Sequence, residues 1–190
     1  MEYKTQIYYV HGFASGANSG TFLKLREEFP WTKALEYDSA LKFEDNLESL
    51  LGQLGKDDEM RLFVGSSLGG LYTLALAMSD KAKSKCILVN PCVQPTESLK
   101  KYIGIQKNFS TGKDFDFSKE AFESYPSGLA EKFSGVECTV LLAKDDEVLD
   151  SNIARNLLKN KAKIVDIVGG HRLSDYEILF KEVNEKLKGE

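Results

Sequence analysis

Short apolar runs alternate along the chain with segments whose apolar residues recur every three or four positions. Six runs have the length and the content of β-branched or aromatic residues that strands require: Gln6–Val10, Ala34–Tyr37, Arg61–Val64, Cys86–Val89, Cys138–Ala143 and Lys163–Val168. Most of them are apolar throughout, which is typical of strands buried on both faces of a parallel sheet. The pattern therefore predicts an α/β fold in which a mostly parallel sheet of about six strands is flanked by helices.

Three of the intervening segments carry an apolar stripe at helical spacing. The stripes are Phe22, Leu25 and Phe29, then Phe43, Leu47, Leu50, Leu51 and Leu54, and finally Tyr176, Leu179, Phe180, Val183 and Leu187. Stripes of this kind indicate helix faces that pack on a core. We expect Pro30 to stop the first helix, Gly55 to cap the end of the second, and Ser174 to be the N-cap of the last.

One connection is much longer than the others. Residues 91–137 show no clear strand pattern, although connections between the helices and strands of such folds usually take only a few residues. Its aromatic residues include Tyr102, Phe109, Phe115, Phe117, Phe122 and Tyr125. It is too short and too polar to form an independent domain. We expect it to be a small cap inserted into a single domain that spans residues 1–190.

Composition and charge exclude several classes of partner. Lys and Arg total 25 against 29 Asp and Glu, so the net charge is −4, and no dense basic run is present. A nucleic-acid partner is therefore not expected. No apolar run approaches the roughly 20 residues of a membrane span, and no signal peptide is expected. Cys86 and Cys138 open apolar runs and no C-x-x-C pair occurs, which favours buried free thiols and a cytoplasmic location.

The strongest chemical signal is the segment 65–70, Gly-Ser-Ser-Leu-Gly-Gly, which matches the pattern G-x-S-x-G with Ser67 at its centre. It follows the predicted strand Arg61–Val64 directly and precedes the helical run Leu71–Met78. In this context the pattern is typical of a nucleophile elbow, a sharp turn that only small flanking residues permit. A phosphate-binding loop is less well supported, because neither G-x-G-x-x-G nor Gly-Lys-Ser/Thr is present.

A nucleophilic serine needs a base, and the chain has two histidines. His171 follows the last predicted strand, at the sheet edge where α/β folds place their chemistry, so we expect it to be the base. The acid should lie between the serine and the histidine, where Asp145 and Asp146 are the two main candidates. Asp146 is the preferred one. We expect Glu147 and Asp150 to be solvated or to belong to the first turn of the next helix.

These motifs together resemble the small YqiA-like esterase family of bacteria, in the α/β-hydrolase superfamily. The matching segments are 11–13, 65–70, 90–91, 146–150 and 169–171. The resemblance implies a reduced α/β-hydrolase fold and a triad of Ser67, Asp146 and His171, with Asp146 rather than Asp145 as the acid. It also implies an oxyanion hole formed by the backbone N–H groups of Phe13 and Leu68.

The role of His11 is expected to be structural, namely to order the turn before Phe13 through its side-chain hydrogen bonds. No metal or organic cofactor is expected, because the two histidines are far apart and neither has the spacing of a metal ligand.

The sequence thus predicts an esterase or thioesterase that acts on a small-molecule ester or acyl-CoA substrate through an acyl-enzyme on Ser67. Some aromatic residues of the cap, from the region of Tyr102 and Phe109, are expected to face the pocket. Two alternatives stay open. The chain could be a non-catalytic ligand-binding protein of the same fold, or a peptidase or acyltransferase that uses the same triad.

Overall fold

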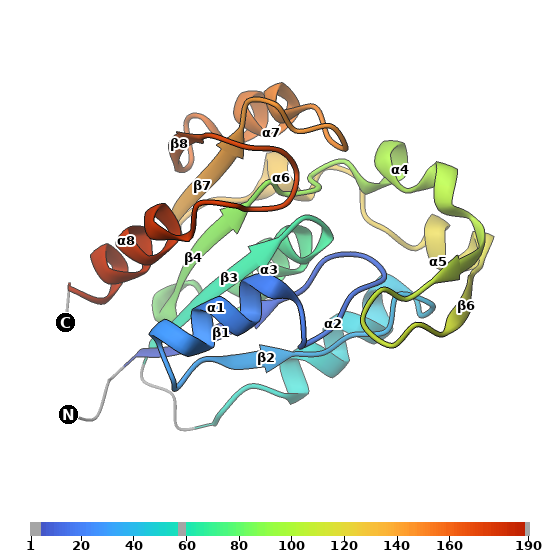
Figure 1. Ribbon diagram of the computed structural model, residues 1–190, viewed down its shortest axis with the longest axis horizontal. Coiled ribbons are helices and arrows are strands. Elements are labelled where there is room, and N and C mark those ends of the chain that lie inside the picture. The colour runs from blue at the N-terminus through green and yellow to red at the C-terminus, as the bar shows by residue number, and fades with distance from the viewer. Residues whose placement is uncertain (1–4, 57–59, 189–190) are drawn as a thin grey trace.

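The computed structural model describes residues 5–56 and 60–188 (Figure 1). Its main sheet has six strands, all parallel, in the order β2-β1-β3-β4-β7-β8. The strands are β1 Thr5–Val10, β2 Lys33–Leu35, β3 Met60–Ser66, β4 Ser84–Val89, β7 Glu137–Ala143 and β8 Lys163–Ile167. The predicted α/β fold with a mostly parallel sheet of about six strands is confirmed. Only the two edge strands, β2 and β8, are shorter than predicted.

Helices cover both faces of this sheet. They are α1 Gly20–Glu28, α2 Phe43–Gly52, α3 Leu68–Ser79, α7 Ser151–Leu158 and α8 Tyr176–Leu187, with a short 3-10 helix η1 Lys81–Lys83 before β4. In Figure 1, α1 and α8 lie on the near face, where their apolar stripes pack against β1, β3 and β4. The α2, α3 and α7 helices pack in the core of the opposite face.

Two predicted helix ends are wrong by a few residues. The N-cap of α8 is Asp175 rather than Ser174, because the Asp175 carboxylate accepts the backbone N–H of Glu177 at 3.1 Å. The α2 helix ends at Gly52, before Gly55, whose N–H instead donates to the hydroxyl of Tyr8 at 2.7 Å. The start of α8 is thus fixed by a side-chain cap, whereas α2 ends in tighter backbone bonds from Gln53 to Leu50 and from Leu54 to Leu51.

The chain between β4 and β7 leaves the sheet. It forms α4 Pro95–Ser98, a 3-10 helix η2 Lys100–Tyr102, β5 Gly104–Lys107, β6 Asp114–Phe117, α5 Lys119–Glu123 and α6 Leu129–Lys132. The expectation that residues 91–137 contain no strand is wrong, since β5 and β6 pair as an antiparallel hairpin. Each strand has only four residues and none of β5 is fully buried, so neither produces a continuous apolar run. Figure 1 shows the hairpin at the end of the molecule opposite α8.

The order of the strands creates a crevice beside β1. The chain passes from β1 to β2 on one side of it and then returns to β3 on the other side. Ligands of α/β folds bind at such a switch point, outside the carboxyl ends of the strands.

Cys86, Cys92 and Cys138 are buried free thiols. In the part of the chain that the structure describes, no helix has both the length and the apolar character needed to cross a bilayer.

The turn between β3 and α3 is packed so closely that its glycines have no room for a side chain. A Cβ at Gly69 would overlap the carbonyl oxygens of Val10 and His11, and a Cβ at Gly65 would lie only 2.8 Å from the carbonyl carbon of Gly69. The first turn of α3 therefore rests directly on the end of β1.

We expect Gly69→Ala to lower the free energy of unfolding by about 3 kcal/mol, because backbone atoms of β1 must move to admit the methyl group. Denaturant unfolding measures this loss. Gly52→Ala is the control, since a Cβ at Gly52 meets nothing within 4 Å. That variant should stay within about 0.5 kcal/mol of the wild type. Equal losses in the two variants would contradict the close packing.

Candidate active site

Ser67 occupies the sharp turn between β3 and α3 in an unfavourable backbone conformation, with φ 52° and ψ −121°. Its backbone is fully engaged: the N–H donates to the Val89 carbonyl at 3.0 Å, and the carbonyl accepts the N–H groups of Gly70 and Cys92, both at 2.9 Å. Backbone strain of this kind persists only where the surroundings enforce it. The turn holds Ser67 at the carboxyl edge of the sheet, as the sequence pattern predicts.

His171 lies in the loop between β8 and α8, and its ring reaches two of the other predicted residues. Its Nε2 lies 3.0 Å from Ser67 Oγ, and its Nδ1 lies 2.8 and 3.1 Å from the two carboxylate oxygens of Asp146. Because a carboxylate can only accept, Nδ1 carries the proton and Nε2 is free to accept from the serine hydroxyl. The structure thus brings Ser67, His171 and Asp146 into one hydrogen-bonded line.

The loop after β7 carries the carboxylates, and their environments differ. The side chain of Asp146 is only 2% exposed, and its Oδ1 also accepts the N–H groups of Val148 and Leu149, each at 2.8 Å. Asp145 is exposed. These backbone donors hold the Asp146 carboxylate in its orientation toward the imidazole, which is the arrangement that an orienting acid needs.

Glu147 is exposed but not simply solvated as expected. Its Oε2 accepts the backbone N–H of His171 at 2.9 Å, and this hydrogen bond lowers the pKa of the Glu147 carboxyl. Asp150 is the N-cap of α7, where its carboxylate accepts the N–H of Asn152 at 2.9 Å. Glu147 therefore helps to hold the histidine loop, whereas Asp150 belongs to the start of the next helix.

The loop after β1 passes directly beside Ser67. A Cβ at Gly12 would lie 3.3 Å from Ser67 Cβ and 3.8 Å from Ser67 Oγ, so the backbone here is next to the serine hydroxyl. Phe13 follows Gly12 in this loop. Leu68 is the first residue of α3, and its N–H is one of those that a helix leaves without an intrahelical partner. The two backbone donors that the family resemblance implies thus belong to the two segments that flank Ser67.

His11 is buried beneath this loop. Its Nδ1 lies 2.9 Å from the carbonyl oxygen of Gly12, its Nε2 lies 3.5 Å from the N–H of Tyr37, and its ring stacks on the Tyr37 ring at 4.3 Å. Burial lowers the pKa of His11. A neutral ring fits these contacts, since Nδ1 then donates to the carbonyl and Nε2 accepts. These contacts agree with the structural role that the sequence predicts.

Asn90 belongs to the matching segment 90–91, but the motifs imply no role for its side chain. It follows β4, is 2% exposed and has a left-handed backbone with φ 44°. Its Oδ1 accepts the N–H of Ala143 at 2.8 Å, and its Nδ2 donates to the carbonyls of Gly170 at 3.2 Å and His171 at 2.9 Å. One buried amide thereby ties the histidine loop to the end of β7, just before the aspartates. Its place in that segment, directly after a central strand, was the available signal.

A cavity of about 900 Å³ opens above Ser67. Its wall includes Phe13, Leu68 and His171, and also Tyr102 and Phe109 of the segment between β4 and β7. Phe109 is 76% exposed, so it lies at the rim. Both aromatic residues that the sequence singles out therefore line the cavity that opens above Ser67.

Cys92 lines the same cavity, and burial raises the pKa of its thiol to about 11. The thiol is therefore neutral near pH 7, which makes it a poor nucleophile.

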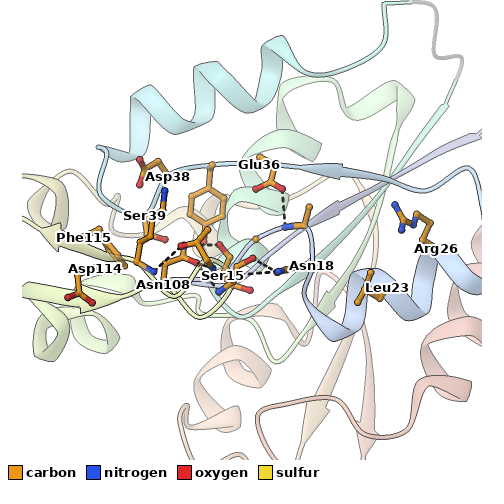
Figure 2. A pocket seen from close by; sticks show the side chains of 16 residues that line it. Ser15, Asn18, Leu23, Arg26, Glu36, Asp38, Ser39, Asn108, Asp114 and Phe115 are labelled. Atoms are coloured by element: carbon orange, nitrogen blue, oxygen red, sulfur yellow. Dashed lines mark hydrogen bonds between the residues drawn. The ribbon is translucent and has the colours of Figure 1, made fainter.

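A second cavity of about 630 Å³ lies between the loop after β1, the loop after β2 and the tip of the β5–β6 hairpin. Figure 2 shows its polar lining, including Ser15, Asn18 and Asn108.

Among residues 5–56 and 60–188, no three side chains of His, Cys, Asp or Glu gather closely enough to hold a metal ion.

Comparison with known proteins identifies the family. A model of the uncharacterised protein family UPF0227 matches residues 6–186. The chain belongs to this family. The match covers nearly the whole chain. It confirms the YqiA-like family, which the sequence motifs of this UPF0227 member resemble.

Solved structures share the fold of this UPF0227 member at low sequence identity. Est1E from Butyrivibrio proteoclasticus has a TM-score of 0.73 at 17% identity, over 97% of this chain and 88% of that one. Alpha/beta hydrolase domain-containing protein 10 from mouse has a TM-score of 0.73 at 16% identity, over 96% and 89%. The monoacylglycerol lipase of Paleococcus ferrophilus has a TM-score of 0.71 at 14% identity, over 95% and 93%. The UPF0227 chain therefore has the α/β-hydrolase fold.

Acid should weaken the fold of the UPF0227 protein partly through His11. Because burial lowers its pKa, the folded state binds the proton less readily than the unfolded state. This contribution to stability is complete above the ordinary histidine pKa of about 6.5 and is lost as the pH falls through the lowered value. Glu36, 3.7 Å from Nε2, opposes the effect only in part. Between about pH 7.5 and 5 the wild type should lose more unfolding free energy than His11→Gln. Equal losses would contradict this account.

Removing the side chain of Asn90 should destabilise the protein in two separable ways. Asn90→Ala leaves a buried N–H and two carbonyls without their partner and also keeps a left-handed backbone at a residue with a Cβ, so we expect a loss of about 3 kcal/mol. Asn90→Gly loses the same hydrogen bonds but tolerates the backbone, so it should be about 1 kcal/mol more stable than Asn90→Ala. Denaturant unfolding measures both. A loss below about 1 kcal/mol in Asn90→Ala would show that the three bonds contribute little.

Proposed function

We propose that the protein is a serine hydrolase that cleaves carboxylic esters or acyl thioesters of small molecules through an acyl-enzyme on Ser67. The observation that carries the proposal is the continuous line from Ser67 Oγ through His171 to the buried Asp146 carboxylate, with distances of 3.0 and 2.8 Å. This line ends on a serine in a strained elbow beside a cavity. Nucleophile, base and orienting acid within hydrogen-bond reach of one another are the signature of covalent acyl transfer.

The steps follow from the geometry. Ser67 Oγ attacks the acyl carbonyl while His171 Nε2 takes the hydroxyl proton, and a tetrahedral oxyanion forms. His171 then gives this proton to the leaving alcohol or thiol, which departs and leaves the acyl group as an ester on Ser67. A water molecule, deprotonated by the same nitrogen, attacks this ester. As the bond between the acyl carbon and Ser67 Oγ breaks, His171 returns the proton to Oγ, which releases the carboxylic acid and restores the serine hydroxyl. Asp146 stays ionised throughout and stabilises the imidazolium that forms in each half-reaction.

The oxyanion needs donors that already point at it. We assign this role to the backbone N–H groups of Phe13 and Leu68, because their segments flank Ser67 on either side. The start of α3 adds the positive end of a helix of 12 residues. A preoriented donor in a water-poor site contributes roughly 3 to 4 kcal/mol to the transition state.

The segment 91–137 would act as a cap of the single domain, with Tyr102 and Phe109 bounding the acyl site. Both side chains line the Ser67 cavity, whose volume of about 900 Å³ accommodates a small organic ester. Two of the similar solved structures support this reading by their names: Est1E with ferulic acid bound, and a monoacylglycerol lipase.

A non-catalytic binding protein of the same fold is the main alternative. Binding alone gives no reason to keep a strained serine, a histidine aimed at its hydroxyl and a buried carboxylate behind that histidine. A peptidase or acyltransferase would use the same three residues, and a panel of substrates separates these activities from ester hydrolysis.

The proposal predicts that a fluorophosphonate probe labels the wild type on Ser67 and leaves Ser67→Ala unlabelled. On p-nitrophenyl esters and acyl-CoA thioesters, Asp146→Asn should lower kcat by about 10⁴, because the amide favours the wrong imidazole tautomer. Asp145→Asn is the matched control, since its exposed side chain should leave kcat within about threefold.

Circular dichroism of each variant shows whether it is folded. Persistent labelling of folded Ser67→Ala, or label found on Ser66, would refute the assignment of the nucleophile. A larger loss in Asp145→Asn than in Asp146→Asn would refute the assignment of the acid. Labelling without turnover of any ester, thioester or peptide would favour the binding protein.

A further inference from the structure

Ala14 has a backbone conformation that alanine normally avoids. Among the described residues other than glycine, φ is positive only at Ala14 (53°), Ser67 (52°) and Asn90 (44°). The latter two lie at the candidate active site, and Ala14 directly follows Phe13, the proposed oxyanion donor. A left-handed backbone is unfavourable for a residue with a Cβ, so the surrounding structure must hold Ala14 in place.

Two hydrogen bonds hold Ala14 from opposite sides. Its N–H donates to the hydroxyl of Ser39 at 2.9 Å, and its carbonyl accepts the N–H of Phe109 at 2.8 Å. Ser39 is 4% exposed and lies in the loop after β2, whereas Phe109 lies at the tip of the β5–β6 hairpin. Neither residue is a neighbour of Ala14 in sequence, so tertiary structure imposes this conformation.

Further contacts tie the same loop to the hairpin tip. Asn108 donates to the Ser15 carbonyl at 3.3 Å, and Asn18 donates to the Ser110 carbonyl at 3.1 Å. Figure 2 shows Ser39, Asn108, Ser15 and Asn18 around the second cavity, with the bonds between loop and hairpin drawn as dashed lines. The loop therefore rests on a polar contact with the hairpin, in addition to its bond to Ser39.

The peptide groups on both sides of Phe13 are thereby fixed. The peptide before it is held through the Gly12 carbonyl by His11, and the peptide after it is held through the Ala14 N–H by Ser39. In a planar trans peptide the direction of the carbonyl fixes that of the N–H. The His11 bond therefore sets the direction of the Phe13 N–H. The Ser39 bond limits its rotation indirectly, because the next peptide is joined to it through φ and ψ of Phe13.

We propose that Ser39 is a positioning residue for the oxyanion hole: its hydroxyl holds the peptide between Phe13 and Ala14 and so helps to keep the Phe13 N–H aimed at the reacting oxygen. This inference rests on the proposed function. Because the donor acts on the oxyanion rather than on the bound ester, loss of Ser39 should affect the transition state more than substrate binding. Ser39 does not contact His171, so the titration of the base should not change.

The test compares Ser39→Ala with Ser39→Thr on a p-nitrophenyl ester. Ser39→Ala should lower kcat about tenfold to hundredfold, with KM within about threefold and an unchanged pH profile of kcat/KM. Ser39→Thr keeps the accepting hydroxyl and should recover most of kcat. The matched control is Ser124→Ala, because the Ser124 hydroxyl also accepts a backbone N–H, that of Phe43 at 2.8 Å, where α2 begins. Ser124→Ala should lower the melting temperature but keep kcat.

A kcat within twofold of the wild type in folded Ser39→Ala would overturn the inference, as would a fall in kcat that comes with a shifted pH profile. If the wild type is active and Ser67→Ala is inactive, such a result refutes the role of Ser39 and leaves the proposed function standing. A wild type without hydrolase activity refutes the proposed function itself.

A second pair of variants keeps the inference testable even if Ser39→Ala does not fold. Phe109 is 76% exposed, so changes there do not disturb the core. Phe109→Pro removes the N–H that bonds to Ala14, whereas Phe109→Ala removes only the side chain. We expect kcat to be about threefold or more lower in Phe109→Pro than in Phe109→Ala. Equal kcat values in the two variants would overturn the dependence of the oxyanion loop on its backbone supports.

Discussion

The close packing of the β3–α3 turn against the end of β1 is the constraint on which the rest of the site depends. Gly65 and Gly69 let the backbones approach so closely that a methyl group would overlap main-chain atoms. Ser67 has its strained conformation in this turn, and a Cβ at Gly12 in the loop after β1 would already lie 3.3 Å from Ser67 Cβ. Nucleophile and proposed oxyanion donors are therefore fixed relative to one another by main-chain packing rather than by flexible side chains.

Much of the fold could be predicted because buried parallel strands leave a simple signal. β1, β3, β4 and β7 are covered on both faces, so they are continuous apolar runs in the sequence. The β5–β6 hairpin escaped prediction because its short strands keep an exposed face. The ends of α2 and α8 were misplaced because a few local hydrogen bonds mark them, and these leave no periodic pattern.

The residues of the candidate site likewise fall into those that the sequence predicts and those that it does not. The pattern around Ser67 is local, and the positions of His171 and Asp146 follow from chain order after successive strands. The structural role of His11 was predicted, but those of Asn90 and Ser39 could not be, because their bonds join distant parts of the chain. Asn90 and His171 are 81 positions apart, and Ser39 and Ala14 are 25 apart. A serine or an asparagine in a loop has no feature in sequence that distinguishes such a role from ordinary solvation.

The two edges of the sheet have a consequence for association between molecules. Exposed edge strands are templates on which another chain can add a strand, and this is a common route to aggregation. Here β2 offers only three residues at one edge, and β8 at the other edge carries charged side chains, with Asp166 paired to Arg155 and Lys163 paired to Glu182 and Glu185. A strand added at either edge would find too few backbone partners or would have to desolvate these ion pairs. The sheet is thus protected against edge-to-edge growth while its carboxyl end stays open to ligands.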